Sequence, residues 1–173
     1  MSARPLIALT CQRLEPGRVW KLDSKTGTGD PARAEVQTLL QANFASKSAA
    51  DLRTLLGHAD MSVREKAQFA LVAKNDATTL ADAADHDTNQ LASIHGMWGM
   101  GQLARKDPAR AASLVPLLVD QDPEIRAQAA KLLGDVRDHD AMSALLPLLT
   151  DAAPRPRFFA AEALGRIGDR AAL

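Results

Sequence analysis

The sequence contains few of the residues on which disulfides, redox motifs and aromatic-rich cores depend. Its 173 residues include a single cysteine, Cys11, together with no tyrosine, two tryptophans and four phenylalanines. One cysteine excludes an internal disulfide, a CxxC redox pair, a zinc site built from several cysteines and a CxxCH haem attachment. Scarce aromatics and abundant alanine and leucine disfavour an all-β fold and favour helices.

The sequence also lacks an excess of charge of either sign and any long apolar run. Lysine plus arginine equals aspartate plus glutamate at 21 each, so the formal net charge is zero. Proteins that coat phosphate backbones usually carry a basic excess, and no nucleic-acid partner is therefore expected. The first ten residues hold no apolar run of signal-peptide length, and no window approaches a membrane span, so we expect a soluble chain.

What the sequence does have is an internal repeat of 31 residues. The segments DPEIRAQAAKLLGDVRD (122–138) and APRPRFFAAEALGRIGD (153–169) align with Arg126 and Arg157 31 residues apart. The same step connects a series of aspartates that close each repeat: Asp76, Asp107, Asp138 and Asp169. A leucine-rich segment precedes each arginine and recurs on the same step. Its residues Leu114, Leu117 and Leu118 correspond to Leu145, Leu148 and Leu149 in the next repeat. Such a period indicates stacked supersecondary units.

Both segments of each repeat have helical spacing. Ile125, Ala129, Leu132, Leu133 and Val136 form one apolar stripe at 3.6 residues per turn, and Asp122-Pro123 is a typical helix start. One hairpin of such helices, A then B, cannot bury its stripe alone, whereas stacked hairpins can. The predicted fold is all-α, an α-solenoid of about four hairpins. The expected division is an N-terminal tail (1–29) with a strand-like stretch at Leu14–Asp23, followed by the array (30–173), which comprises 30–48, 49–76, 77–107, 108–138 and 139–173.

Two columns of polar residues follow the repeat. The donor column is predicted to contain Arg33, Arg64, His95, Arg126 and Arg157. Hydrogen-bond acceptors stand six residues before the last four of these, at His58, Asn89, Asp120 and Asp151. Because the two columns recur together, we interpret them as a structural ladder that ties the A–B turns of adjacent units. A basic, anion-binding stripe is the alternative.

The stretch SIHGMWGMGQLARKD (93–107) places three glycines and a tryptophan inside a predicted B helix. On the 31-residue step, Trp98 occupies the place of Ala67, Ala129 and Ala160. We expect the glycines to create the space for this large side chain, at about 1 kcal/mol of helix propensity each. The alternative is a possible partner surface in which Met97, Trp98 and Met100 are exposed.

No residue pattern indicates catalysis, a metal or a cofactor. The histidines are His58, His86, His95 and His139; the cluster of His86 with Asp82, Asp85 and Asp87 matches no EF-hand spacing, and a solvated turn is expected there. The segment Ser24–Asp30 lacks the full phosphate-loop spacing and is expected to be a linker. No serine stands in GxSxG, and no histidine lies near Cys11 in sequence.

The segments 114–136 and 145–168 resemble HEAT repeats, particularly the short variety found in phycobilisome-lyase-like proteins. Together with NQLASIHGMWGMGQLARKD (89–107), they are similar to the HEAT segment of bacterial proteins that join a sugar-dehydrogenase-like propeller to a CxxCH cytochrome c domain. The resemblance implies an extracytoplasmic or periplasmic location. The chain holds neither propeller nor CxxCH, and no polar cap follows the last repeat, so a fragment of a longer protein is expected.

The function expected from these features is a non-catalytic scaffold. Its partner would be another protein or a neighbouring domain of the same polypeptide, because solenoids present extended binding surfaces. Two alternatives remain open: a HEAT-like DNA-binding enzyme that excises alkylated bases, and a bilin-lyase-like chaperone.

Overall fold

The computed structural model describes residues 7–13, 18–24, 30–86 and 89–168. It divides into two compact units, Met1–Ala42 and Asn43–Leu173. The first unit contains β1 (Ile7–Arg13), β2 (Arg18–Ser24) and helix α1 (Pro31–Gln41). The strands pair antiparallel with Ile7 opposite Ser24 and Arg13 opposite Arg18. The predicted strand-like stretch overlaps β2, whereas β1 was not predicted because its sequence lacks strict apolar–polar alternation.

Helix α1 begins where the sequence predicts a leading helix, since the Asp30 carboxylate accepts a hydrogen bond from the Ala32 nitrogen (2.9 Å) and Pro31 follows. It ends at Gln41, however, and groups with the N-terminal strands. The expected division had instead placed this helix with the repeats.

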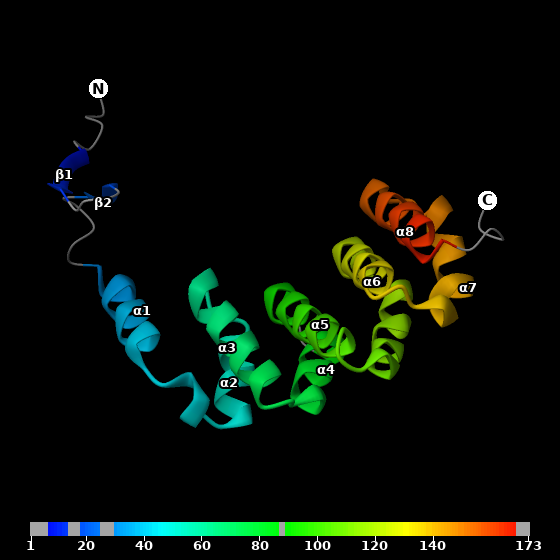
Figure 1. Ribbon diagram of the computed structural model, residues 1–173, viewed down its shortest axis with the longest axis horizontal. Helices are drawn as coiled ribbons and strands as arrows, with labels where there is room; N and C mark the ends of the chain where they lie inside the picture. The colour runs from blue at the N-terminus through cyan, green and yellow to red at the C-terminus, as the bar shows by residue number, and fades with distance from the viewer. Residues whose placement is uncertain (1–6, 14–17, 25–29, 87–88, 169–173) are drawn as a thin grey trace. The chain divides into compact units, whose positions relative to one another are not determined.

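The second unit is a row of four helix pairs within the described residues. The A segments are α2 (Ala49–Leu55), α4 (Ala77–His86), η2 (Pro108–Val119) and the run η3 (His139–Ala141), α7 (Met142–Leu145) and η4 (Leu146–Thr150), with η1 (Phe44–Ser46) preceding them. The B helices are α3 (Met61–Ala73), α5 (Gln90–Ala104), α6 (Pro123–Asp135) and α8 (Pro154–Ile167). Consecutive B helices contact one another along one side of the row, and the A segments occupy the other side (Figure 1). The predicted helical solenoid is confirmed for this unit.

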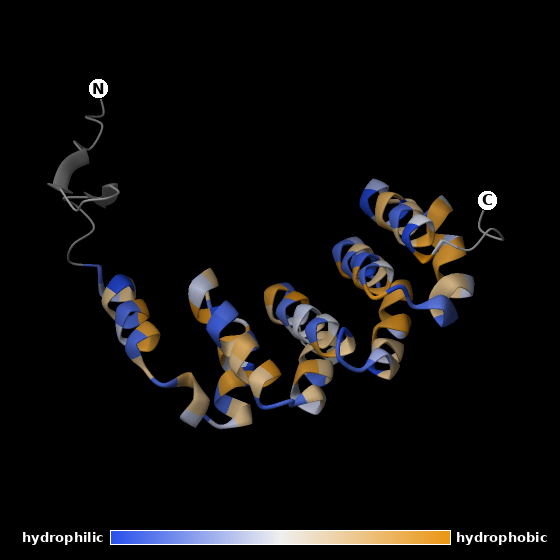
Figure 2. Cartoon of the chain, viewed as in Figure 1, coloured by the Kyte–Doolittle hydropathy of each residue, from blue (hydrophilic) through white to orange (hydrophobic). Residues whose placement is uncertain are grey.

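The later A segments differ from the regular α-helices that were expected. The segments η2 and η4 are 3-10 helices and contain Pro116 and Pro147, respectively. Proline has no backbone N–H and disfavours a continuous α-helix, so these segments wind more tightly. Part of each segment still faces the core, since Leu114 and Leu118 of η2 and Leu148 of η4 are buried. Figure 2 shows these A segments as largely hydrophobic, while α6 and α8 alternate hydrophobic and hydrophilic stretches, as half-buried helices do.

The pattern of buried residues shows that α5 is displaced by one residue relative to the 31-residue repeat. In α3 the buried stripe is Val63, Ala67 and Leu71, and in α6 it is Ile125, Ala129 and Leu133. In α5 the corresponding buried residues are His95, Gly99 and Leu103, which lie 32 residues after the first set and 30 before the second. The residue on the exact step, Trp98, is 37% exposed. The prediction that Trp98 takes the place of the buried alanines is therefore wrong.

The turns after the helices explain this offset. The nitrogens of Asp76 and Asp138 donate to carbonyls five residues back, Leu71 and Leu133, with Asn75 and Arg137 at positive φ. The Asp107 nitrogen donates to Leu103, only four residues back. The turn after α5 is thus one residue shorter, although the aspartates keep the 31-residue step.

The glycines of α5 allow close approach to neighbouring helices and do not make room for Trp98. A Cβ on Gly96 would lie 2.7 Å from the Leu80 carbonyl oxygen and 2.8 Å from the Ala84 nitrogen of α4. A Cβ on Gly99 would lie 2.5 Å from Leu80 Cδ2. Because backbone atoms of α4 cannot swing away as a side chain can, Gly96 fixes the spacing of this pair.

We predict that Gly96→Ala destabilises the chain by about 1–2 kcal/mol, because the cost of overpacking exceeds the gain in helix propensity. The matched control is Gly165→Ala in α8, where an added Cβ meets nothing within 4 Å. That variant should be unchanged or stabilised by up to about 1 kcal/mol. Urea unfolding followed by circular dichroism measures both, and equal stability of the two variants would contradict the close-approach explanation.

Candidate functional site

Three arginines of the predicted ladder hold the A–B turns of their own units. In each, Nη1 donates to the carbonyl oxygens six and five residues earlier. Arg64 binds His58 (2.7 Å) and Ala59 (2.8 Å), Arg126 binds Asp120 (2.7 Å) and Gln121 (3.1 Å), and Arg157 binds Asp151 (2.7 Å) and Ala152 (3.1 Å). These carbonyls precede the B helix, so the arginine side chain folds back over the start of its own helix.

The side chains of the acceptor column mainly close the turns themselves. His58 Nδ1 accepts from the Asp60 nitrogen (3.0 Å), Asp120 Oδ1 accepts from the Asp122 nitrogen (2.7 Å), and Asn89 Oδ1 accepts from the Leu91 nitrogen (3.0 Å). Asn89 also donates to the Gly57 carbonyl of the preceding unit (3.1 Å).

One ladder pair joins adjacent units through two charged groups. Arg126 Nε and Nη2 each donate to a carboxylate oxygen of Asp151 at 2.8 Å, a bidentate pair with 16% and 11% of the two side chains exposed. The hydrogen bonds from Arg126 hold the pKa of Asp151 below its ordinary value. Arg64 has no equivalent, and its buried Nε is without a hydrogen-bond partner in the part of the chain that the structure describes.

The other two predicted donors lie elsewhere. Arg33 is on α1, in the N-terminal unit. His95 stands in the apolar stripe, where Val63 and Ile125 are the equivalents, and Gly96 takes the place of the arginines. His95 Nδ1 donates to Gln68 Oε1 of α3 (2.8 Å) and does not reach Asn89. The offset of α5 is the reason, because it moves His95 inward by one position.

His95 is 2% exposed and uncharged at neutral pH. Burial, with a smaller effect from the charge of Arg64, lowers the pKa of His95 to about 4. The edge of its ring meets the ring of Trp98, with centroids 4.9 Å apart and planes at 67°.

Trp98 is held in place from both sides. Its indole nitrogen donates to Gln128 Oε1 of α6 (3.0 Å), and Gln128 Nε2 donates to Glu124 Oε1 (2.8 Å). Glu124 in turn pairs with Arg155 of α8 (2.7 Å). We call this series the polar chain; it links all four B helices through Gln68, His95, Trp98, Gln128, Glu124 and Arg155.

The alternative of an exposed methionine–tryptophan surface is correct only for Trp98. Met97 and Met100 are 0% and 3% exposed and belong to the core. A one-residue displacement rotates a helix by about 100°, which brings these two side chains inward and Trp98 outward.

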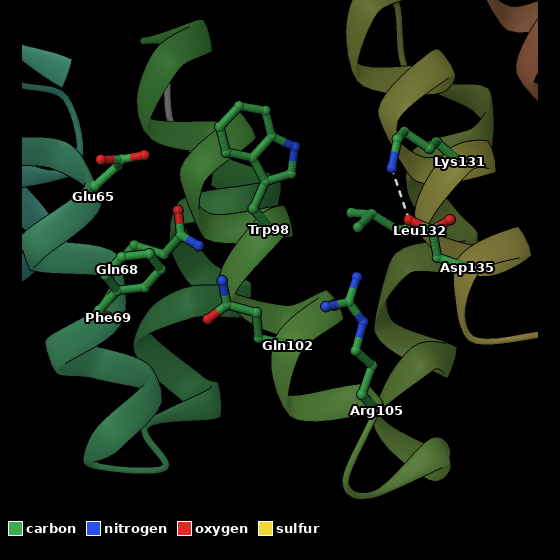
Figure 3. A pocket seen from close by; sticks show the side chains of 10 residues that line it. Glu65, Gln68, Phe69, Trp98, Gln102, Arg105, Lys131, Leu132 and Asp135 are labelled. Atoms are coloured by element: carbon green, nitrogen blue, oxygen red, sulfur yellow. Dashed lines mark hydrogen bonds and ion pairs between the residues drawn. The ribbon is translucent and has the colours of Figure 1, made fainter. Parts of the chain in front are cut away.

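A groove lies on the solvent-facing side of α3, α5 and α6, beside Trp98 (Figure 3). It has a volume of about 270 Å³, and we call it the B-face groove; its lining consists of Glu65, Gln68, Phe69, Trp98, Gly101, Gln102, Arg105, Lys131, Leu132 and Asp135. Phe69 is 52% exposed, and Trp98, which lines the same groove, is 37% exposed. Lys131 and Asp135 form an ion pair (2.7 Å), whereas Glu65 and Arg105 have none among the described residues.

Sequence reasoning missed Phe69, Arg105 and the glutamines of this groove. One signal was available for Phe69, which falls off the apolar stripe Val63–Ala67–Leu71 of its helix. Asp87 of the predicted solvated turn lies outside the described residues, as does most of the predicted linker Ser24–Asp30. The described residues contain no cluster of three or more metal-ligating side chains, and none of the described helices has the length and apolar character needed to cross a bilayer.

We predict that Arg126→Ala lowers the free energy of unfolding by about 1–3 kcal/mol, because it leaves the Asp151 carboxylate and two turn carbonyls without their donor. Arg157→Ala is the matched control: it loses the same two kinds of carbonyl contact at an exposed site and should cost less than about 1 kcal/mol. A double-mutant cycle with Asp151→Asn measures the coupling, and additive effects of the two changes would argue against a cross-unit pair.

We also predict that acid destabilises the fold through His95. Its pKa is lower in the folded chain, so the unfolded chain binds more protons between about pH 6.5 and 4, and stability falls as the pH falls through this window. The loss should be on the order of 3 kcal/mol by pH 4. Chemical unfolding across this range measures the slope. His95→Val, which restores an apolar residue like those at the equivalent positions, should flatten the slope.

Comparisons with known proteins agree with this architecture. Residues 111–173 match the family model of HEAT repeats. No curated protein sequence matches that of this chain.

Solved structures with similar folds are also helical-repeat proteins. The complex of CpcE and CpcF of phycocyanin lyase from Nostoc sp. PCC7120 has a TM-score of 0.54 at 19% identity, covering 79% of this chain and 92% of that one. Two engineered proteins have TM-scores of 0.51 and 0.50 at 20% identity each; they cover 84% and 83% of this chain, and 80% and 76% of their own. At such identities the likeness extends to the fold alone. Residues 111–173 thus resemble HEAT repeats, and the unit Asn43–Leu173 shares its helical-solenoid fold with these solved structures.

Proposed function

We propose that the unit Asn43–Leu173 is a non-catalytic interaction scaffold. It would hold a segment of a partner protein, or of a neighbouring domain of the same polypeptide, in the B-face groove. The observation that carries the proposal is the pair of aromatic side chains, Phe69 and Trp98, that remain exposed on adjacent B helices. Tryptophan is enriched among the residues that dominate binding energies at protein interfaces.

Two further features support a protein partner. The polar chain fixes Trp98 before anything binds, which lowers the entropic cost of association. The B-face groove, at about 270 Å³, is smaller than the roughly 300–1,000 Å³ of typical small-molecule sites. A groove of this size suits one or two side chains of a partner better than a cofactor.

The two alternative functions receive less support. A site for DNA would present a surplus of positive charge, but the groove is lined by two acidic and two basic residues. The likeness to phycocyanin-lyase subunits is one of fold at 19% identity, and no described residue extends it to a bilin.

Site-directed photo-crosslinking in cells that carry the natural gene would test the scaffold proposal. A photoreactive phenylalanine analogue is placed at position 69 in the groove or, as a control, at position 158 on α8, where Phe158 is also exposed (64%). We expect position 69 to crosslink reproducibly to one polypeptide segment, identified by mass spectrometry, and Trp98→Ala to remove that product. Equal, unspecific labelling from both positions would contradict the proposal.

A further inference from the structure

We propose that the B-face groove takes an extended protein segment in which an apolar side chain is followed closely by a carboxylate. The apolar side chain would lie between Phe69 and Trp98, and the carboxylate would pair with Arg105. This inference rests on the proposed scaffold function and adds the chemistry of the partner.

The apolar part of the groove is formed by residues from three helices. Phe69 comes from α3, Trp98 from α5 and Leu132 from α6, and Gly101 between them has no side chain. A Cβ on Gly101 would lie 2.6 Å from Leu132 Cδ2, so the glycine lets α6 approach and leaves the floor of the groove low. Burying one leucine-sized or phenylalanine-sized side chain there removes apolar surface from water and so favours binding of the segment.

The polar part of the groove favours a peptide backbone. Gln68 and Gln102 contribute side-chain amides to the lining from two adjacent helices (Figure 3). An amide both donates and accepts hydrogen bonds, as the peptide groups of an extended segment do. Gln68 is only 3% exposed and its Oε1 already accepts from His95, so Gln102 is the amide that remains for the backbone of a bound segment.

The charges of the groove decide the sign of the partner. Lys131 is neutralised by Asp135, which also pairs with Arg166 of α8. Arg105 has no ion-pair partner within the described ranges, and its planar guanidinium can bind a carboxylate through two hydrogen bonds. Glu65 lies at the opposite end of the groove and repels a second acidic group there (Figure 3). The acidic residue of the segment therefore lies on the α5–α6 side of its apolar residue.

A selection from a library of random 12-residue peptides displayed on phage tests this assignment, with the full chain as bait. Sequencing should show enrichment of Leu, Met or Phe with Asp or Glu within two positions. The same selection on Arg105→Glu should replace the acidic residue by Lys or Arg. Lys106→Glu, an exposed neighbouring charge that does not line the groove, is the matched control and should leave the enriched pattern unchanged.

The best synthetic peptide then gives a quantitative readout by fluorescence anisotropy. Arg105→Glu should weaken its binding by about tenfold or more, and exchanging the acidic residue of the peptide for lysine should restore binding to that variant alone. Trp98→Ala should abolish binding while circular dichroism shows that the helices are retained.

The remaining outcomes separate the two proposals. Peptides that require Trp98 but show no preference for charge would overturn the assignment of the carboxylate and leave the scaffold function standing. An absence of enrichment over bare support, or peptides that bind Trp98→Ala equally well, would overturn both. Self-association of the wild-type chain in sedimentation, lost in Trp98→Ala, would assign the groove to a second copy of the chain and overturn the inference.

Discussion

The unit Asn43–Leu173 depends on the burial of one apolar stripe per B helix against the helices on either side. Residues spaced four apart form that stripe, and its middle position is always small: Ala67, Gly99, Ala129 and Ala160. Small residues there let neighbouring helices approach, so each stripe is covered only when its neighbours are present. This mutual burial explains why a sequence with few aromatics can form an ordered stack, since close packing of alanine and leucine contributes dispersion contacts that large side chains supply elsewhere.

The sequence predicts this stack well because the signals for it are local. The aspartate–proline start of α6, its apolar spacing and the closing aspartates act within one repeat, and their recurrence indicates stacking. The position of α5 within the stack could not be predicted in the same way. Asp107 stays on the 31-residue step, while the helix before it is displaced by one residue. The displacement becomes visible only in the folded chain, for example in the contact between Gly96 and the backbone of α4.

That displacement also accounts for the errors at the candidate site. One residue corresponds to about 100° of rotation, so counting from the aspartates assigns each side chain to the wrong side of α5. The count places Trp98 in the core, but it lies at the surface, and it places His95 in the ladder, but it lies in the apolar stripe. The same count allowed the alternative that Met97 and Met100 are exposed, whereas both are buried. Phe69 and Arg105 were missed for a different reason, since the groove that they line joins three helices and has no signature within any one repeat.

The displacement of α5 has a structural cost. Gly96 stands where an arginine would tie the turn, so α5 lacks the contact that Arg64, Arg126 and Arg157 make in their units. The start of α5 is held instead by Asn89, which caps the helix and donates to the Gly57 carbonyl, and α5 approaches α4 closely at Gly96. Departures from a local rule within a regular array tend to occur where function requires them. Here the departure places the Trp98 ring outside the stack, where His95 and Gln128 orient it. In a strictly regular α5, position 98 would be buried.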